Sequence, residues 1–111
     1  MKITSKDTFI ILEDERDDIL DFATYLEGVI PLEYSQNNII VDLLKYDTLP
    51  LEQLLLFLKL SNAHRANKKS FVFVNTAVNF NLIPDEIIVV PTIQEAEDII
   101  SMEEIERDLG F

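Results

Sequence analysis

The 111-residue chain has no cysteine, no tryptophan, two glycines and one histidine. Without cysteine it has no disulfide framework, no thiol nucleophile and no thiolate metal site, which is typical of a protein of the reducing cytoplasm. The two glycines, Gly28 and Gly110, both stand near the ends of predicted helices, so there is no glycine-rich phosphate loop and no dinucleotide fingerprint. These absences argue against a cofactor enzyme, and we expect no bound cofactor.

Positive charge is also scarce. The chain has nine lysines and arginines and 21 aspartates and glutamates, which gives a net charge of -12. This is the wrong sign for a surface that must neutralise phosphates, so we expect no nucleic acid partner. Long apolar runs are missing too: residues 9–12 are shorter than the core of a signal peptide, and no segment approaches a membrane span. We therefore expect a cytoplasmic protein that does not bind membranes.

The chain does have the material for one hydrophobic core, since 48% of its residues are hydrophobic and its length suits a single domain, 1–111. Short β-branched and aromatic runs alternate with amphipathic stretches. The predicted order is ββαβαβ(α)βα, with strands near 2–4, 8–12, 39–43, 71–74 and 87–90. This order predicts an α/β fold with a central, mostly parallel mixed sheet of four or five strands covered by helices.

The predicted second helix, near 50–67, is apolar almost all round. On a straight helix one set of leucines shares the face that a sheet would bury, namely Leu51, Leu54, Leu55 and Leu58. A second set points the opposite way, namely Leu56, Phe57, Leu60 and Ala63. The second set is either core beneath another helix, such as the terminal one, or a surface left for a partner or a second copy of the chain.

The predicted last helix switches its apolar face at Ser101. Thr92 to Glu95 and Ser101 to Glu104 both have the spacing of a capping box. We therefore predict a break at Ser101 and a short helical extension over 102–111, ending near Gly110.

Residues for catalysis are few. His64, on the predicted second helix, is expected to lie at the surface or at an interface beside Phe57 and Leu60. An enzyme would have to combine it with Asp47 and Glu52 around the loop before that helix. The acidic run 13–18 lacks the alternating ligands and glycine of a calcium loop, so we expect no metal site.

One basic cluster stands at the end of the second helix. It contains Lys59, Arg65, Lys68 and Lys69. Cations there complement the helix dipole, and they also provide a surface that steers an acidic protein.

Four segments resemble the STAS domain, the fold of the bacterial anti-sigma factor antagonists. They are Asn38-Ile39-Ile40-Val41-Asp42-Leu43 with the leucine-rich helix after it, Lys69-Ser70-Phe71-Val72-Phe73-Val74-Asn75, and Val90-Pro91-Thr92-Ile93-Gln94-Glu95-Ala96. With residues 9–12 and the acidic helix that follows, the resemblance spans most of residues 8–100. It implies a non-enzymatic regulatory module that binds a protein partner, in the family's best-known case a serine kinase acting as an anti-sigma factor.

The chain departs from that family at the start of the second helix, where the family carries a phosphorylated serine in Asp-Ser-Ser-Gly. Here the segment is Leu49-Pro50-Leu51-Glu52-Gln53, which has no hydroxyl. Glu52 or Leu51 stands about where the serine would be, and Glu52 is a candidate constitutive mimic of its phosphorylated state. Thr48 is the nearest candidate for phosphorylation, although a threonine in such a turn is usually a local hydrogen-bonding residue.

The sequence therefore predicts a STAS-like module that binds a kinase-like or other regulatory protein through its second helix and the preceding loop. The residues expected at this contact are Thr48, Glu52, Leu56, Phe57, Leu60 and His64. A homodimer through the same leucines is an alternative. So is an accessory role beside a processing nuclease such as ribonuclease Z, next to which some similar chains are encoded, and so is the small enzyme described above.

Overall fold

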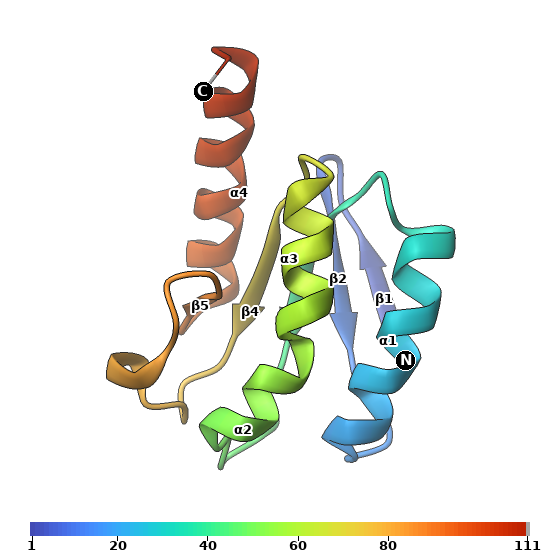
Figure 1. The fold of residues 1–111 in the computed structure, drawn as a ribbon, viewed down its shortest axis with the longest axis vertical. Coiled ribbons are helices and arrows are strands. Elements are labelled where there is room, and N and C mark those ends of the chain that lie inside the picture. Colours follow the sequence, from blue (N-terminus) through green and yellow to red (C-terminus); the bar gives the residue numbers. More distant parts are fainter. Residues whose placement is uncertain (111) are drawn as a thin grey trace.

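The computed structural model describes residues 1–110 and contains a single five-stranded mixed sheet with helices on both faces (Figure 1). In chain order the elements are β1 (Lys2–Ser5), β2 (Phe9–Glu13), α1 (Ile19–Glu33), β3 (Asn38–Asp42), α2 (Leu51–Leu54), the 3₁₀ helix η1 (Leu55–Phe57), α3 (Leu58–Ala66), β4 (Phe71–Val74), the 3₁₀ helix η2 (Phe80–Leu82), β5 (Ile88–Val90) and α4 (Ile93–Asp108). The predicted α/β class, the mostly parallel sheet and the order of elements are confirmed.

The strands lie in the sheet in the same order as in the chain, β1-β2-β3-β4-β5. β1 is antiparallel to β2, and the other three pairs are parallel, with Ile40 placed between Ile11 and Val72. Because the carboxyl ends of parallel strands meet at one edge, the segments that follow β2, β3 and β4 lie together at the lower edge of Figure 1.

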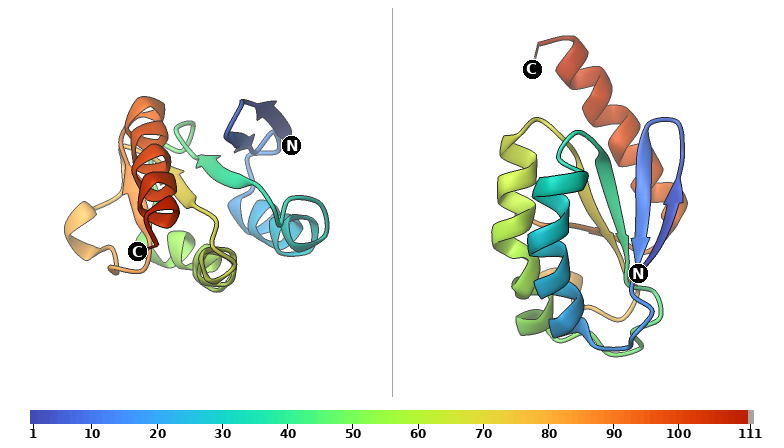
Figure 2. Two further views of the ribbon diagram at one scale, coloured as in Figure 1. Left: turned by 90° about the horizontal axis from the view of Figure 1, so that it is seen from above. Right: turned by 90° about the vertical axis from the view of Figure 1, so that its right-hand side faces the viewer.

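The helices form two unequal layers. α1 and the continuous helical segment α2–η1–α3 cover one face of the sheet, and α4 lies on the other (Figure 2). The larger core lies under the first layer and the smaller one, which includes Ile40, Val72 and Ile100, under α4. β3 and β4 are thus covered on both sides, which explains their almost uninterrupted apolar sequences.

The second helical segment does not bury the face that a straight helix predicts. Its buried residues Leu54, Phe57, Leu60 and His64 are spaced by three or four, whereas Leu55 is exposed. The reason is η1: a 3₁₀ turn has about three residues per turn instead of about 3.6, so the helix after it presents a rotated face. The prediction that the sheet buries Leu51, Leu54, Leu55 and Leu58 together is therefore wrong.

The stripe of Leu56, Phe57, Leu60 and Ala63 is divided. Phe57 and Leu60 belong to the core, Leu56 is half-buried and Ala63 is exposed. The Phe57 ring packs edge-on against Phe22 of α1 and Phe73 of β4, with ring centroids 6.2 and 5.3 Å away. The cover is thus α1 and the sheet, and not the terminal helix.

α4 is continuous from Ile93 to Asp108, so the predicted break at Ser101 and separate extension over 102–111 are wrong for the described residues; Phe111 lies outside them. Thr92 caps the start of α4 as predicted, because its Oγ1 accepts a hydrogen bond from the Glu95 amide at 3.1 Å, and it also donates to the Glu95 carboxylate at 3.0 Å. The segment from Ser101 to Glu104 does not begin a new helix, because Ser101 lies inside the unbroken α4.

Replacing Phe57 with alanine tests the altered helix face. We expect Phe57→Ala to lower the free energy of unfolding by about 3–5 kcal/mol, because it removes a fully buried ring between two other rings. The exposed Leu55 is the matched control, and Leu55→Ala should cost about 0.5 kcal/mol. Urea unfolding of both variants measures this, and equal costs would contradict the assignment of the buried face.

Candidate functional site

The candidate site is the loop from Leu43 to Pro50, here called the carboxyl-edge loop, with the first turn of the helical segment after it. The loop leaves the end of β3 between the ends of β2 and β4. In open α/β sheets this edge is where ligands and partners usually bind, because loops of neighbouring strands converge there. It is also where the sequence predicts Thr48 and Glu52 to act.

One fully buried side chain holds the backbone of this loop. Asn75, directly after β4, donates hydrogen bonds from Nδ2 to the carbonyl oxygens of Leu43 at 2.8 Å and Tyr46 at 3.1 Å. Its Oδ1 accepts from the amides of Ala77 at 2.8 Å and Val78 at 2.9 Å. Because all four bonds come from one amide group, the loop after β3 and the turn after β4 are fixed relative to each other.

A second contact fixes the loop from the side of β2. The Tyr46 hydroxyl donates to Asp14 Oδ2 at 2.5 Å, and the other Asp14 oxygen accepts from the Arg16 amide at 3.0 Å. Burial by itself raises the pKa of Asp14, but these hydrogen bonds and the nearby Lys45 outweigh it, so this pKa lies below its ordinary value. The Asp14 carboxylate therefore serves as a fixed charged acceptor for the loop.

Lys45 adds a bridge from the same loop to the turn after β2. Its Nζ donates to the Asp14 carbonyl oxygen at 2.6 Å and lies 2.8 Å from Asp17 Oδ1. The hydrogen bond to Asp17 raises the pKa of Lys45. The loop is thus tied to β2 through both a tyrosine and a lysine.

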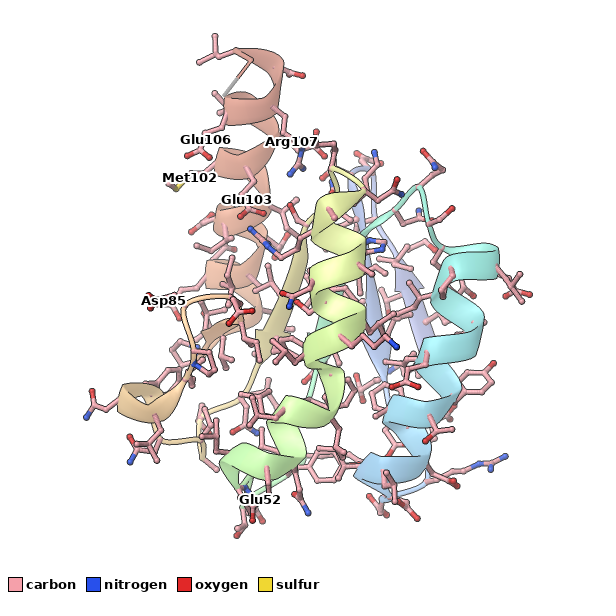
Figure 3. All side chains as sticks on the ribbon, viewed as in Figure 1. Glu52, Asp85, Met102, Glu103, Glu106 and Arg107 are labelled. Atoms are coloured by element: carbon pink, nitrogen blue, oxygen red, sulfur yellow. The ribbon has the colours of Figure 1, made fainter. Side chains whose placement is uncertain are left out.

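On the outer side these anchors leave a small mixed surface, here called the docking face. It is defined by exposed side chains of the loop and of the helical segment after it, namely Leu44, Thr48, Glu52 and Leu55, together with the half-buried Leu56. Glu52 and Leu55 are three residues apart on one helical segment and share a side of it. Glu52 lies in the first turn of that segment, as the sequence predicts (Figure 3).

The other predicted contact residues are not at this surface. Three of them, Phe57, Leu60 and His64, are buried. In this conformation they pack between the helix and the sheet and are not available to a partner. The expectation that His64 lies at the surface is wrong, because the rotation at η1 turns it toward the sheet. Its ring packs edge-on against Phe71, with centroids 5.5 Å apart.

His64 also lies at the opposite edge of the sheet from the carboxyl-edge loop. Its Nε2 is 2.7 Å from the carbonyl oxygen of Asn37, immediately before β3, whereas Asp47 and Glu52 follow the end of β3. Burial lowers the pKa of His64, and this outweighs the hydrogen bond to Asn37. The structure therefore does not assemble the group of Asp47, Glu52 and His64 that the enzyme alternative requires.

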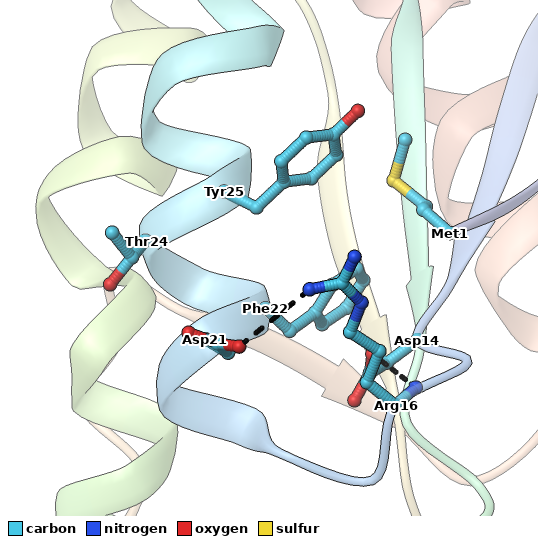
Figure 4. Close-up of a pocket in the computed structure, with 7 residues that line it drawn as sticks. All are labelled: Met1, Asp14, Arg16, Asp21, Phe22, Thr24 and Tyr25. Atoms are coloured by element: carbon cyan, nitrogen blue, oxygen red, sulfur yellow. Dashed lines mark hydrogen bonds and ion pairs between the residues drawn. The ribbon is translucent and has the colours of Figure 1, made fainter.

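A pocket lies beside the candidate site, between the amino terminus and α1 (Figure 4). It has a volume of about 350 Å³ and is lined by Met1, Asp14, Arg16, Asp21, Phe22, Thr24 and Tyr25. Arg16 lies 4.0 Å from Asp21, and Asp14 is already occupied by the contacts described above. The buried carboxylate of the pocket, Asp14, is thus held by the loop and by the turn after β2.

Within residues 1–110, no three or more His, Asp and Glu side chains are grouped so that they could hold a metal ion. In the same part of the chain, no helix is both long and apolar enough to span a membrane. Comparison of the sequence with protein-family models finds no match, and comparison with curated proteins finds none either.

Removing the side chain of Asn75 tests the anchoring of the loop. We expect Asn75→Ala to lower the free energy of unfolding by about 3 kcal/mol, because two carbonyls and two amides lose their partner in the interior. Asn79, an exposed asparagine that accepts one amide hydrogen bond, is the matched control, and Asn79→Ala should cost about 1 kcal/mol. Chemical denaturation at neutral pH measures both costs. Equal costs for Asn75→Ala and Asn79→Ala would contradict the anchoring role of Asn75.

The buried histidine predicts a pH dependence of stability. Because the pKa of His64 is lower in the folded chain, the unfolded chain binds more protons, and stability falls as the pH drops below about 6.5. From pH about 7 to pH about 5, the stability of the wild type should therefore fall more than that of His64→Gln. If the free energy of unfolding changed with pH equally in the two proteins, the prediction would be wrong.

Proposed function

We propose that this chain is a non-enzymatic, STAS-like regulatory module that binds a protein partner through the docking face. The observation that carries the proposal is the anchoring of the carboxyl-edge loop by Asn75 and Tyr46. A loop fixed in this way loses little conformational entropy on binding, so its exposed side chains are prepared for a partner. The α/β fold and the order of elements are compatible with the resemblance to STAS domains, which supports the proposal.

The chemistry of the docking face favours a protein over a small molecule. It combines two exposed leucines with a hydroxyl and a carboxylate, and Asp47 is also exposed on the loop. Apolar anchors with a polar rim are typical of protein contacts. The net charge of -12 favours a partner whose contact surface is positive, since complementary charge speeds association.

Glu52 has a specific place in this proposal. Its side chain is exposed in the first turn of α2, where the resemblance places a regulated serine. A fixed carboxylate there supplies negative charge without phosphorylation, so the module would be held in one binding state. Thr48 is exposed four residues earlier and is the position at which a kinase could add further charge.

The partner that the resemblance implies is an ATP-binding kinase-type regulator. Tagged wild-type chain and a Leu55→Asp variant, each with its fold verified, are used to capture partners from native lysate. Mass spectrometry should identify such a regulator with the wild type alone. With that regulator purified, Glu52→Lys should weaken its binding at least about tenfold, as expected for a central contact residue.

Leu32→Asp is the control, because Leu32 is 85% exposed on α1, away from the docking face. It should bind like the wild type. Capture of a processing nuclease instead would favour the accessory role, and loss of self-association alone in Leu55→Asp would favour a homodimer. A partner bound equally by all variants would contradict the proposed surface.

A further inference from the structure

On the second half of α4, Glu103 and Arg107 face the protein, whereas the apolar side chains Met102, Ile105 and Leu109 face outward. Met102, Ile105 and Leu109 are 57%, 59% and 67% exposed. In Figure 3, Met102 and Glu106 project away from α3, whereas Glu103 and Arg107 project toward it. This arrangement is the reverse of an ordinary surface helix, whose apolar stripe faces the core.

A polar network on the inner side explains why the helix faces this way. Glu103 lies 2.7 Å from Arg65 Nη2 and accepts a hydrogen bond from Ser70 Oγ at 2.6 Å. Arg107 donates to the Asn38 side chain at 3.3 Å and to Ser70 Oγ at 3.2 Å. Burial raises the pKa of Glu103, but its contacts with Arg65 and Ser70 outweigh this, so the carboxyl pKa is lowered.

The network also restrains rotation of α4. Asn38 Nδ2 donates to Glu104, and Asn38 and Ser70 are themselves buried at the starts of β3 and β4. Turning the helix to bury Ile105 would withdraw Glu103, Glu104 and Arg107 from these partners and leave buried polar groups unsatisfied. The apolar stripe is therefore held outward.

The spacing of the stripe is that of a helix contact. Met102, Ile105 and Leu109 stand at i, i+3 and i+7, which are the anchor positions of a helix that packs against another helix or in a groove. Asp98 and Glu106 lie four residues on either side of Met102, and Asp108 lies three after Ile105, so carboxylates frame the stripe. On the described part of this outward side there is no lysine or arginine, since Arg107 faces inward.

The carboxylates around the stripe favour one kind of binding partner. A second copy would bring the carboxylates of both stripes together with no cation between them, and each copy carries a net charge of -12. Anionic lipid and nucleic acid are disfavoured for the same reason. A helix that carries lysines or arginines along its apolar side would instead pair with Asp98, Glu106 and Asp108.

We propose that the outward face of α4, from Asp98 to Leu109, is a second docking surface that binds a basic amphipathic helix of a partner protein. It lies on the face of the sheet opposite α1 and α3. The proposal does not rest on the proposed function, because no residue of the carboxyl-edge loop takes part. Together, the two surfaces would let one small domain bridge two proteins.

The probe is a synthetic helical peptide of about 20 residues, with leucines on one side and lysines along their border. It is titrated into the isotope-labelled full chain, and amide chemical shifts are recorded at moderate salt. Two further peptides are the controls. One has glutamates in place of the lysines, and the other has a scrambled sequence in which the leucines no longer lie on one side of the helix.

The lysine peptide should shift amides of 98–110 and bind at least about tenfold more tightly than either control peptide. Ile105→Asp should weaken binding at least about tenfold, and Leu109→Ser should weaken it as well. Leu32→Asp and Leu55→Asp should bind the peptide within about twofold of the wild type. Since all four substitutions are at exposed positions, unchanged thermal unfolding verifies each fold.

Several results would overturn the proposal. One is a set of shifts centred on the acidic turn before α1, and another is equal binding of the lysine and scrambled peptides. A third is a wild-type dimer in sedimentation that Ile105→Asp converts to a monomer, which would assign the surface to a second copy. Absence of peptide binding would overturn it as well.

Discussion

The carboxyl edge of the sheet depends on the amide group of Asn75. Its four hydrogen bonds connect the end of β3, the middle of the following loop and the turn after β4. β3 and β4 are buried on both faces, so packing fixes their positions. Asn75 in turn fixes the loop after β3 and the turn after β4 relative to these strands. The docking face therefore takes its shape from a residue that no partner could touch.

Polar side chains have a similar role at the other edge of the sheet. Asn38 and Ser70 are buried where β3 and β4 begin, and they hold Glu104, Glu103 and Arg107 of α4. Each of these groups hydrogen-bonds to at least one other member, so the charged side chains of α4 have partners at this edge. At both edges, buried polar groups thus decide which side chains are left exposed.

Much of the fold could be predicted from the sequence, because its strands are apolar runs and Thr92 to Glu95 carries a capping signal. The face of the second helix could not, since the 3₁₀ turn at Leu55–Phe57 leaves no mark in the leucine pattern and its rotation is set by packing of Phe57 against Phe22 and Phe73. The continuity of α4 through Ser101 was equally hidden, because it depends on partners some 30 residues or more away in the chain. For the site, Thr48 and Glu52 are exposed at the carboxyl edge and their role stays a prediction, while the anchoring residues Asn75 and Tyr46 were not predicted. For Asn75 the available signal was its place, as a polar residue directly after the predicted strand 71–74.

The central claim is that the carboxyl-edge loop is ordered before any partner binds. Backbone ¹⁵N relaxation of the free chain tests it directly at Leu44, Lys45, Tyr46, Asp47, Thr48 and Leu49. The account predicts order parameters of about 0.85, equal to those of β3, because Asn75 and Tyr46 hold the backbone on two sides. Values below about 0.6 across these residues would contradict it, since a loop that mobile presents no preformed surface.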